Sequence, residues 1–128
     1  MSLQSVGDWM VDRPAPPATV PLDAPFSEVV SSITEGRKGA VAVVGADGIL
    51  AGIITDGDVR RAFTRDIAAV VAADIMSPNP KVVGPGARMS DVVDLIVQNK
   101  ISNLFVTVEG RPVAIVHIAE LMQAGYVS

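Results

Sequence analysis

The chain repeats one pattern of apolar, acidic and turn-forming residues, and this internal duplication limits the folds open to it. Residues 27–30 (Ser-Glu-Val-Val) match residues 90–93 (Ser-Asp-Val-Val), 63 positions later. After a one-residue slip, the turn at Asp47-Gly48 matches Glu109-Gly110. A repeat of about 60 residues predicts two similar structural units. We therefore assign residues 6–66 to the first repeat, 67–128 to the second, and 1–5 to a linker or cloning remnant.

Both repeats present the same order of secondary-structure signals. An extended stretch precedes a helix, which Ser27 opens in the first repeat and Ser90 in the second, because serine is a favoured N-cap residue. An apolar strand, a glycine-containing turn and a second strand then predict a β-hairpin, and a closing helix follows. Each repeat is thus predicted to be β-α-β-β-α. The predicted strands are 18–22, 40–44 and 50–54, then 81–84, 104–108 and 113–116, and the closing helices are 58–65 and 119–124.

Composition favours a mixed α/β fold. Hydrophobic residues make up 49% of the chain but aromatic residues only 4%, so the core has to be built from Val, Ile, Ala, Leu and Met side chains. This composition suits helices packed on sheets and argues against disorder. A single repeat buries too little apolar surface to be stable alone. We therefore predict an α/β (α+β) fold of two repeats related by a pseudo-twofold axis, with the small sheets packed together and the helices outside.

Charge and residue usage exclude several classes of function. Ten basic against fourteen acidic residues give a net charge of −4 without a basic cluster, so we expect no nucleic-acid partner. The absence of cysteine and a single histidine argue against disulfides, a thiol nucleophile and a Cys/His zinc site. No apolar run approaches the ~20 residues of a membrane span, so we expect no membrane partner and a cytoplasmic location. Because no nucleophilic or acid–base pair can be assembled, we predict no catalytic residues and no enzyme activity for this chain.

The segment 52–61 concentrates the polar chemistry of the chain. The polar residues that follow its apolar strand are Thr55, Asp56, Asp58, Arg60 and Arg61. A hydroxyl, carboxylates, free backbone N–H groups and two guanidinium groups therefore converge on one turn at a helix start. These are the groups that bind a sugar phosphate or a nucleotide.

The same residues have structural alternatives. Thr55 and Asp58 are spaced as a capping box, which would stabilise the helix start by about 1 kcal/mol without any ligand. The two arginines would then be solvated, or paired with Asp56 or Asp66. An Asp56/Asp58 pair without further oxygen ligands is too little for a metal site, so none is predicted.

A duplicated β-α-β-β-α unit with Gly-Ile-Ile-Thr-x-x-Asp at 52–58 resembles the CBS domain, and two copies over residues 6–127 resemble a CBS pair, or Bateman module. More narrowly, segments 6–10, 52–62 and 121–125 are similar to the C-terminal regulatory CBS pair of arabinose 5-phosphate isomerases of the KpsF/GutQ type. That resemblance implies a module of Kdo, lipopolysaccharide or capsule synthesis that regulates an N-terminal sugar isomerase domain absent from this sequence. The Thr-Asp-Gly-Asp segment also resembles CBS pairs that accompany sugar nucleotidyltransferase domains.

The resemblance to CBS pairs implies a ligand site in the first repeat. Thr55 would meet a phosphate or ribose, and Asp58 would hold the ribose hydroxyls. The pocket wall implied by the family comprises Thr19, Val20, Gly39, Ala40 and Val41. No cofactor is implied as required; the implied effector is a nucleotide, AMP or ATP, or the sugar nucleotide CMP-Kdo. A homodimer formed through CBS pairs is also implied, and so is a purely structural role in oligomerisation as the alternative.

The second repeat departs from this pattern. His117 stands where the first repeat has Thr55, and Glu120 stands where it has Asp58. The isomerase family often has histidine at the first of these positions, so His117 agrees with it. A lone histidine after an apolar strand is either a hydrogen-bonded structural residue or a ligand contact. We include His117 and Glu120 among the candidate ligand-binding residues on the strength of the resemblance.

Overall fold

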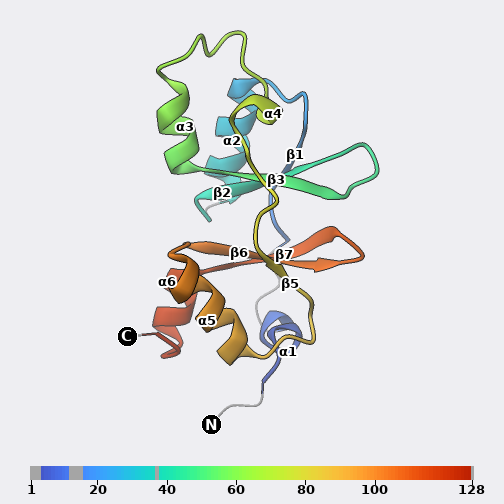
Figure 1. The fold of residues 1–128 in the computed structure, drawn as a ribbon, viewed down its shortest axis with the longest axis vertical. Helices are drawn as coiled ribbons and strands as arrows, with labels where there is room; N and C mark the ends of the chain where they lie inside the picture. Colours follow the sequence, from blue (N-terminus) through green and yellow to red (C-terminus); the bar gives the residue numbers. More distant parts are fainter. Residues whose placement is uncertain (1–3, 12–15, 37, 128) are drawn as a thin grey trace. The chain divides into compact units, whose positions relative to one another are not determined.

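A computed structural model describes residues 4–11, 16–36 and 38–127 and divides the chain into two compact units (Figure 1). The unit that we call the N-unit comprises Pro17–Pro80. The C-unit comprises the segment from residue 81 onward together with the N-terminal helix. Residues 1–3, part of the expected linker or cloning remnant, lie outside the described residues.

The N-unit is a four-stranded mixed sheet covered by helices on one face (Figure 1). The strands lie in the order β1-β2-β3-β4, with β1 parallel to β2 and the other neighbours antiparallel. Its core is built from aliphatic side chains of the sheet and of the helices α2 (Phe26–Gly36) and α4 (Ala72–Ile75), as the composition requires. Its elements are β1 (Thr19–Pro21), α2 (Phe26–Gly36), β2 (Ala40–Val44), β3 (Leu50–Thr55), α3 (Asp56–Ala62), α4 (Ala72–Ile75) and β4 (Ser77–Pro78).

The C-unit repeats this plan with a three-stranded sheet in the order β5-β6-β7, where β5 is parallel to β6 and β6 is antiparallel to β7. Its core combines sheet residues with the apolar faces of three helices. The elements are α1 (Val6–Val11), β5 (Val82–Val83), α5 (Met89–Asn99), β6 (Asn103–Val108), β7 (Arg111–His117) and α6 (Ile118–Gln123). Within the described part of the chain, none of the helices has the length and hydrophobicity needed to cross a lipid bilayer.

The predicted β-α-β-β-α order is confirmed in both units, and the predicted boundaries differ mainly at helix ends. The predicted serine starts are wrong in both repeats. Helix α2 begins at Phe26, one residue before Ser27. Helix α5 begins at Met89, and its N-cap is Arg88, with no side-chain cap bond. The closing helix of the N-unit starts at Asp56, earlier than predicted, since Thr55 caps it. It ends at Ala62, short of the predicted residue 65.

Two short helices pack in the unit formed mainly by the other repeat. Helix α1 precedes the first repeat's strands but belongs to the C-unit, where Val6 and Trp9 are buried and the Val6 N–H donates to the Ala87 carbonyl at 2.7 Å. Helix α4 precedes the second repeat's strands but belongs to the N-unit, where the N–H of the buried Ala72 donates to the Ala24 carbonyl at 2.9 Å. The compact units and the sequence repeats therefore differ by these two helices.

Candidate functional site

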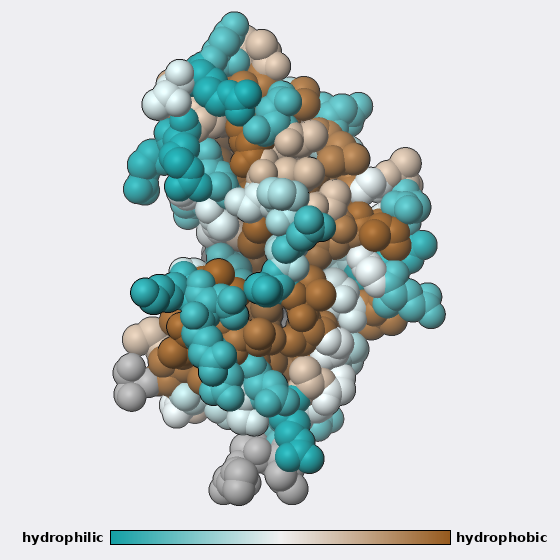
Figure 2. Space-filling view, in the orientation of Figure 1, coloured by the Kyte–Doolittle hydropathy of each residue, from teal (hydrophilic) through white to brown (hydrophobic). Residues whose placement is uncertain are grey.

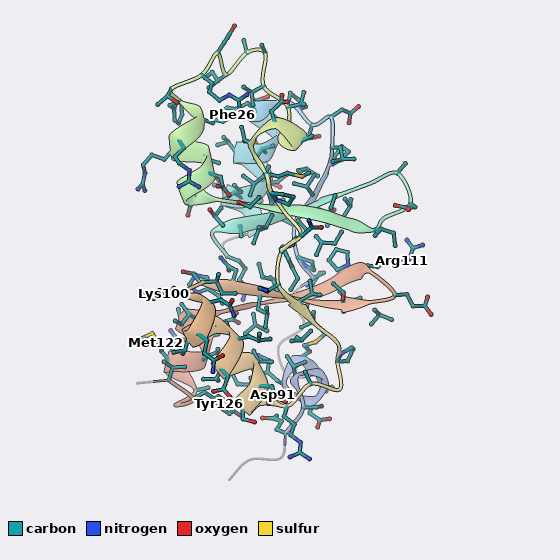
Figure 3. The ribbon with its side chains drawn as sticks, viewed as in Figure 1. Phe26, Asp91, Lys100, Arg111, Met122 and Tyr126 are labelled. Atoms are coloured by element: carbon teal, nitrogen blue, oxygen red, sulfur yellow. The ribbon has the colours of Figure 1, made fainter. Side chains whose placement is uncertain are left out.

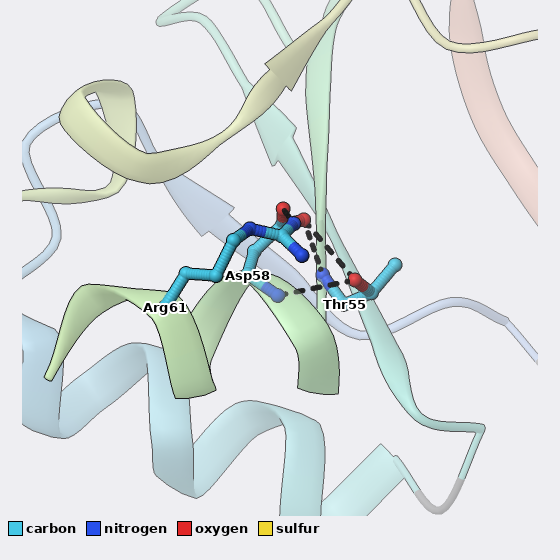
Figure 4. A network of polar contacts seen from close by, with 3 residues as sticks. All are labelled: Thr55, Asp58 and Arg61. Atoms are coloured by element: carbon cyan, nitrogen blue, oxygen red, sulfur yellow. Dashed lines mark hydrogen bonds and ion pairs between the residues drawn. The ribbon is translucent and has the colours of Figure 1, made fainter.

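The junction between β3 and α3 is a hydrogen-bonded capping box, as the structural alternative predicts (Figure 4). The Thr55 N–H donates to Asp58 Oδ2 at 2.9 Å, and the Asp58 N–H donates to Thr55 Oγ1 at 3.4 Å. The Thr55 hydroxyl also donates to Asp58 Oδ2 at 3.2 Å. Asp58 is only 7% exposed, and hydrogen bonds from Thr55 fix the position of its carboxylate in the turn.

Arg61 completes the network by forming an ion pair with Asp58 Oδ1 (Figure 4). The sequence suggested Asp56 or Asp66 as partners, which is wrong for Arg61, because one helical turn places its guanidinium over Asp58. The Arg61 side chain is 73% exposed, so the guanidinium lies at the surface while its partner carboxylate is buried. Arg60 is exposed, and in the described residues it forms no ion pair.

Gly57 lies next to this arrangement. A Cβ at this position would lie 3.4 Å from Arg61 Nη1 and 3.7 Å from Thr55 Oγ1. The Thr55 hydroxyl and the Arg61 guanidinium therefore both lie next to a residue that has no side chain. A guanidinium can bind a carboxylate and an anionic ligand with separate N–H groups, because it carries five donors.

The predicted pocket-wall residues fall into two groups. Gly39 and Ala40 lie beside the capping box: the Asp56 N–H donates to the Gly39 carbonyl at 3.2 Å, and Ala40 is directly opposite Thr55 in the β2–β3 pair. The other three are placed differently. Val20 and Val41 belong to the N-unit core, so only their backbone could meet a ligand, and Thr19 is exposed on β1 opposite Ala42.

The junction between β7 and α6 repeats the capping box with different side chains. The His117 N–H donates to Glu120 Oε1 at 3.0 Å, and His117 Nδ1 accepts from the Ala119 N–H at 3.0 Å. Both side chains are half-buried. His117 is therefore a hydrogen-bonded structural residue, and a ligand contact by it remains a prediction.

Sequence reasoning missed Asn103, whose side-chain Oδ1 is buried without a hydrogen-bond partner in the described part of the chain. The strand was predicted to begin one residue later, which left this position outside the sheet. The matching position of the first repeat is Ala40. The polar Asn103 at the equivalent point of the second repeat was the signal that could have identified it. As for metals, no three His, Asp or Glu side chains among the described residues cluster as an ion would require.

Comparison with known proteins matches both repeats. The family model described as CBS domain matches residues 6–65 and 71–126. Arabinose 5-phosphate isomerase KpsF of Escherichia coli is 37% identical over 90 residues, which are 69% of this chain and 28% of that protein. Arabinose 5-phosphate isomerase KdsD of Pseudomonas aeruginosa is 31% identical over 107 residues, which are 81% of this chain and 33% of that protein. The chain thus spans about a third or less of the length of these curated relatives.

Solved structures share the fold at low sequence identity. CBS domain NE2398 has a TM-score of 0.86 at 19% identity, covering 97% of this chain and 99% of its own. CBSX2 in complex with AMP has a TM-score of 0.77 at 20% identity, covering 94% and 95%. The CBS domain pair of MJ0100, in complex with methylthioadenosine and S-adenosyl-L-methionine, has a TM-score of 0.80 at 22% identity, covering 96% and 98%. The predicted α/β fold class is confirmed.

Proposed function

The chain belongs to the CBS domain family as a tandem CBS pair, and from this we propose that it is a regulatory module that binds a nucleotide at the β3–α3 junction. One observation carries the proposal: the Thr55 hydroxyl, the buried Asp58 carboxylate and the exposed Arg61 guanidinium meet at one turn. A ribose offers hydroxyls to a carboxylate, and a phosphate offers oxygens to a guanidinium. The three groups together therefore suit a ribose phosphate.

An adenine nucleotide is the ligand that we favour, and CMP-Kdo is the alternative. Support comes from two structural neighbours, which are described in complex with AMP and with methylthioadenosine and S-adenosyl-L-methionine. Ligand binding would compete with the existing contacts. Arg61 would transfer one or more N–H groups from Asp58 to a phosphate, and Asp58 Oδ1 would then accept from a ribose hydroxyl.

We further propose that the module regulates an attached sugar isomerase domain. Two curated relatives, KpsF and KdsD, are arabinose 5-phosphate isomerases, of which this chain matches 28% and 33% of the length. A nucleotide that binds one conformation of the module better than another would shift the conformational equilibrium of the parent enzyme. A sugar nucleotidyltransferase parent is the alternative. In either case the nucleotide pool that the module would sense lies in the cytoplasm.

Titration calorimetry with AMP, ATP, CMP and CMP-Kdo tests the binding function. We expect a dissociation constant at or below the millimolar range for at least one of them, and we expect Asp58→Asn to remove the heat contributed by the N-unit. Arg60→Gln is a matched control, because Arg60 forms no ion pair in the described residues. Absence of heat for all four ligands at millimolar concentration would overturn the proposal.

A second function, holding an oligomer together, is favoured by exposed apolar side chains on the helices. Phe63 is 63% exposed and packs edge-on against Phe26 (labelled in Figure 3), with ring centroids 5.4 Å apart. Met122 on α6 is 51% exposed, and apolar surface lies between hydrophilic side chains in the space-filling view (Figure 2). Sedimentation velocity of Phe63→Ser tests this function for the N-unit: a homodimer held through Phe63 would dissociate, whereas Asp58→Asn would leave its mass unchanged.

A further inference from the structure

The N-terminal residues 4–9, which we call the entry segment, are bound to the C-unit through their backbone. Backbone hydrogen bonds join them to the stretch that leads into α5. The N–H groups of Val6, Gly7 and Met89 donate to the carbonyls of Ala87, Pro85 and Gln4 at 2.7, 2.8 and 3.0 Å, respectively. A Cβ at Gly7 would lie 2.9 Å from the Pro85 carbonyl oxygen, so the two backbones are in direct contact. The entry segment is therefore fixed to the C-unit at several points.

Helix α6 ends in a turn that carries Tyr126 back onto the C-unit core. The Tyr126 N–H donates to the Leu121 carbonyl at 2.9 Å, and the Gly125 N–H donates to the Met122 carbonyl at 3.1 Å. Gly125 has a φ of 86°, in the left-handed region that glycine adopts readily. These features form a Schellman motif, which ends a helix in a defined geometry. The last turn of α6 therefore sets the position of the Tyr126 backbone.

The Tyr126 side chain joins the end of α6 to the entry segment. Its hydroxyl donates to Gln4 Oε1 at 2.8 Å, although the two residues are 122 positions apart in the chain. Its ring packs edge-on against the buried Trp9, with ring centroids 5.5 Å apart. The aromatic pair and the hydrogen bond each stabilise this contact. Tyr126 therefore connects the two ends of the described chain through one side chain.

The N-unit makes the equivalent connection with exposed side chains. The residue equivalent to Tyr126 is Thr64, whose hydroxyl donates to the Arg61 carbonyl of its own helix at 2.8 Å. The exposed Arg65 instead reaches the preceding helix α4, where its Nη1 donates to the Asp74 carbonyl at 2.9 Å. A solvated arginine with one hydrogen bond holds less firmly than a half-buried aromatic ring with two contacts. The C-unit is therefore the unit with the stronger connection.

We infer that Tyr126 is a latch that holds the entry segment on the C-unit and makes the C-unit the output side of the module. A domain attached before Gln4 then moves with the C-unit, although α1 belongs to the first repeat in sequence. The proposed function places nucleotide binding in the N-unit, so input and output lie in different units. The inference rests on the proposed function in one respect, that the regulated domain precedes residue 4.

Amide hydrogen exchange of the full chain, followed by nuclear magnetic resonance, measures how often the latch opens. The probes are the Val6 and Gly7 amides, which are hydrogen-bonded across the contact. Tyr126→Ala should speed their exchange at least about tenfold, whereas the amides of β6 should change by less than about threefold. Tyr126→Phe keeps the ring, loses one hydrogen bond and should give about a threefold increase at the probes. Met122→Ala, on the same helix and 51% exposed, is the matched control and should behave as wild type.

A disulfide across the same contact supplies a rescue experiment. Ser5 and Arg88 form an antiparallel β-bridge, in which Cα atoms lie about 4.5–5.5 Å apart, within the range that a disulfide spans. Because the chain contains no cysteine, Ser5→Cys with Arg88→Cys creates a single possible bond. When oxidised in the Tyr126→Ala background, this pair should return the Val6 and Gly7 exchange rates to within about threefold of wild type. The reduced pair should not.

The outcomes separate the latch from general stability and from the proposed function. Unchanged probe exchange in Tyr126→Ala would overturn the latch. So would an equal acceleration of the β6 amides, because Tyr126 would then stabilise the C-unit as a whole. Failure of the oxidised disulfide to restore slow exchange would also contradict it. Since exchange is measured without nucleotide, these results are independent of calorimetry with AMP: absence of binding removes the proposed function, whereas wild-type exchange in Tyr126→Ala removes the latch.

Discussion

The two capping boxes share a backbone arrangement and differ in charge. In the N-unit, residues 55–61 carry two carboxylates and two guanidinium groups, whereas the equivalent residues 117–123 of the C-unit carry one carboxylate and one imidazole. In both, an N-cap side chain and the residue three positions later satisfy the first free N–H groups of a helix. Capping alone therefore does not require the guanidinium of Arg61 that pairs with Asp58, so this charge calls for another explanation.

Fold and ligand roles coincide at some of these residues and separate at others. Thr55 and Asp58 cap α3, so changing them affects both stability and any ligand. Arg61 is 73% exposed, and an ion pair of this kind contributes under about 1 kcal/mol to stability. Exchanging N-unit residues for their C-unit equivalents therefore distinguishes the two roles.

The largest expected effect is a loss of stability of the C-unit. Trp9 is 4% exposed and packs edge-on against Tyr126 (labelled in Figure 3), with ring centroids 5.5 Å apart. Trp9→Ala should lower the free energy of unfolding of the C-unit by about 3–5 kcal/mol, measured by urea denaturation followed by circular dichroism. Val11→Ala on the same helix, where the side chain is 76% exposed, should change it by less than about 0.5 kcal/mol. Equal effects of the two variants would show that α1 is not part of the C-unit core.

The next exchange concerns Gly52, whose C-unit equivalent is Ala114. A Cβ at Gly52 would lie 2.5 Å from Met76 Sδ and 2.9 Å from the Ser77 carbonyl oxygen, because β4 pairs with β3 at this point. Gly52→Ala should therefore destabilise the N-unit by about 1–3 kcal/mol through overpacking. The melting temperature measures this, and an unchanged value would mean that β4 does not press against β3.

Arg61→Gln, which installs the C-unit residue Gln123, should separate binding from stability. The expected loss of stability is under about 1 kcal/mol, since the ion pair is exposed on one side. The affinity for AMP at the N-unit should fall about tenfold, because one charge-assisted contact to phosphate is lost. Arg60→Met, the equivalent exchange for Met122, serves as the control in the same calorimetric titration. A nucleotide affinity that responds equally to both would contradict the role of Arg61.

The smallest effect is expected for Gly57→Ala, whose C-unit equivalent is Ala119. Gly57 lies within α3, and a Cβ there would make contacts of 3.4 Å or longer. Alanine favours the helix by up to about 1 kcal/mol over glycine, so the melting temperature should rise slightly or stay constant. A clear fall would show that the guanidinium of Arg61 needs more space than the structure gives it.

The sequence predicted the β-α-β-β-α order because the duplication presents each signal twice. The strand 40–44 was placed at its observed bounds, since its buried run of Ala and Val is flanked by turn residues. The exchange of α1 and α4 was not predicted, because the contact of Val6 with the segment at Ala87 joins residues far apart in the chain. Such contacts depend on tertiary packing, which local patterns do not encode.

Only part of the candidate site was predicted from the sequence. Thr55 and Asp58 were found because a capping box has a fixed spacing. The partner of Arg61 was not found, because its long side chain can reach several carboxylates, and which one it contacts depends on the backbone conformation. Asn103 was missed because its significance depends on burial and on its cross-strand neighbour His117, and both follow from the folded sheet.

The central claim is that the charged β3–α3 junction of the N-unit binds a nucleotide. The most direct test follows the amide signals of Thr55 and Asp58 during AMP titration of the wild type, Asp58→Asn and Glu120→Gln. We predict saturable shifts in the wild type, a dissociation constant at least tenfold higher in Asp58→Asn, and no change in Glu120→Gln. Equal dissociation constants in the wild type and in Asp58→Asn, or no shift at all, would contradict the account.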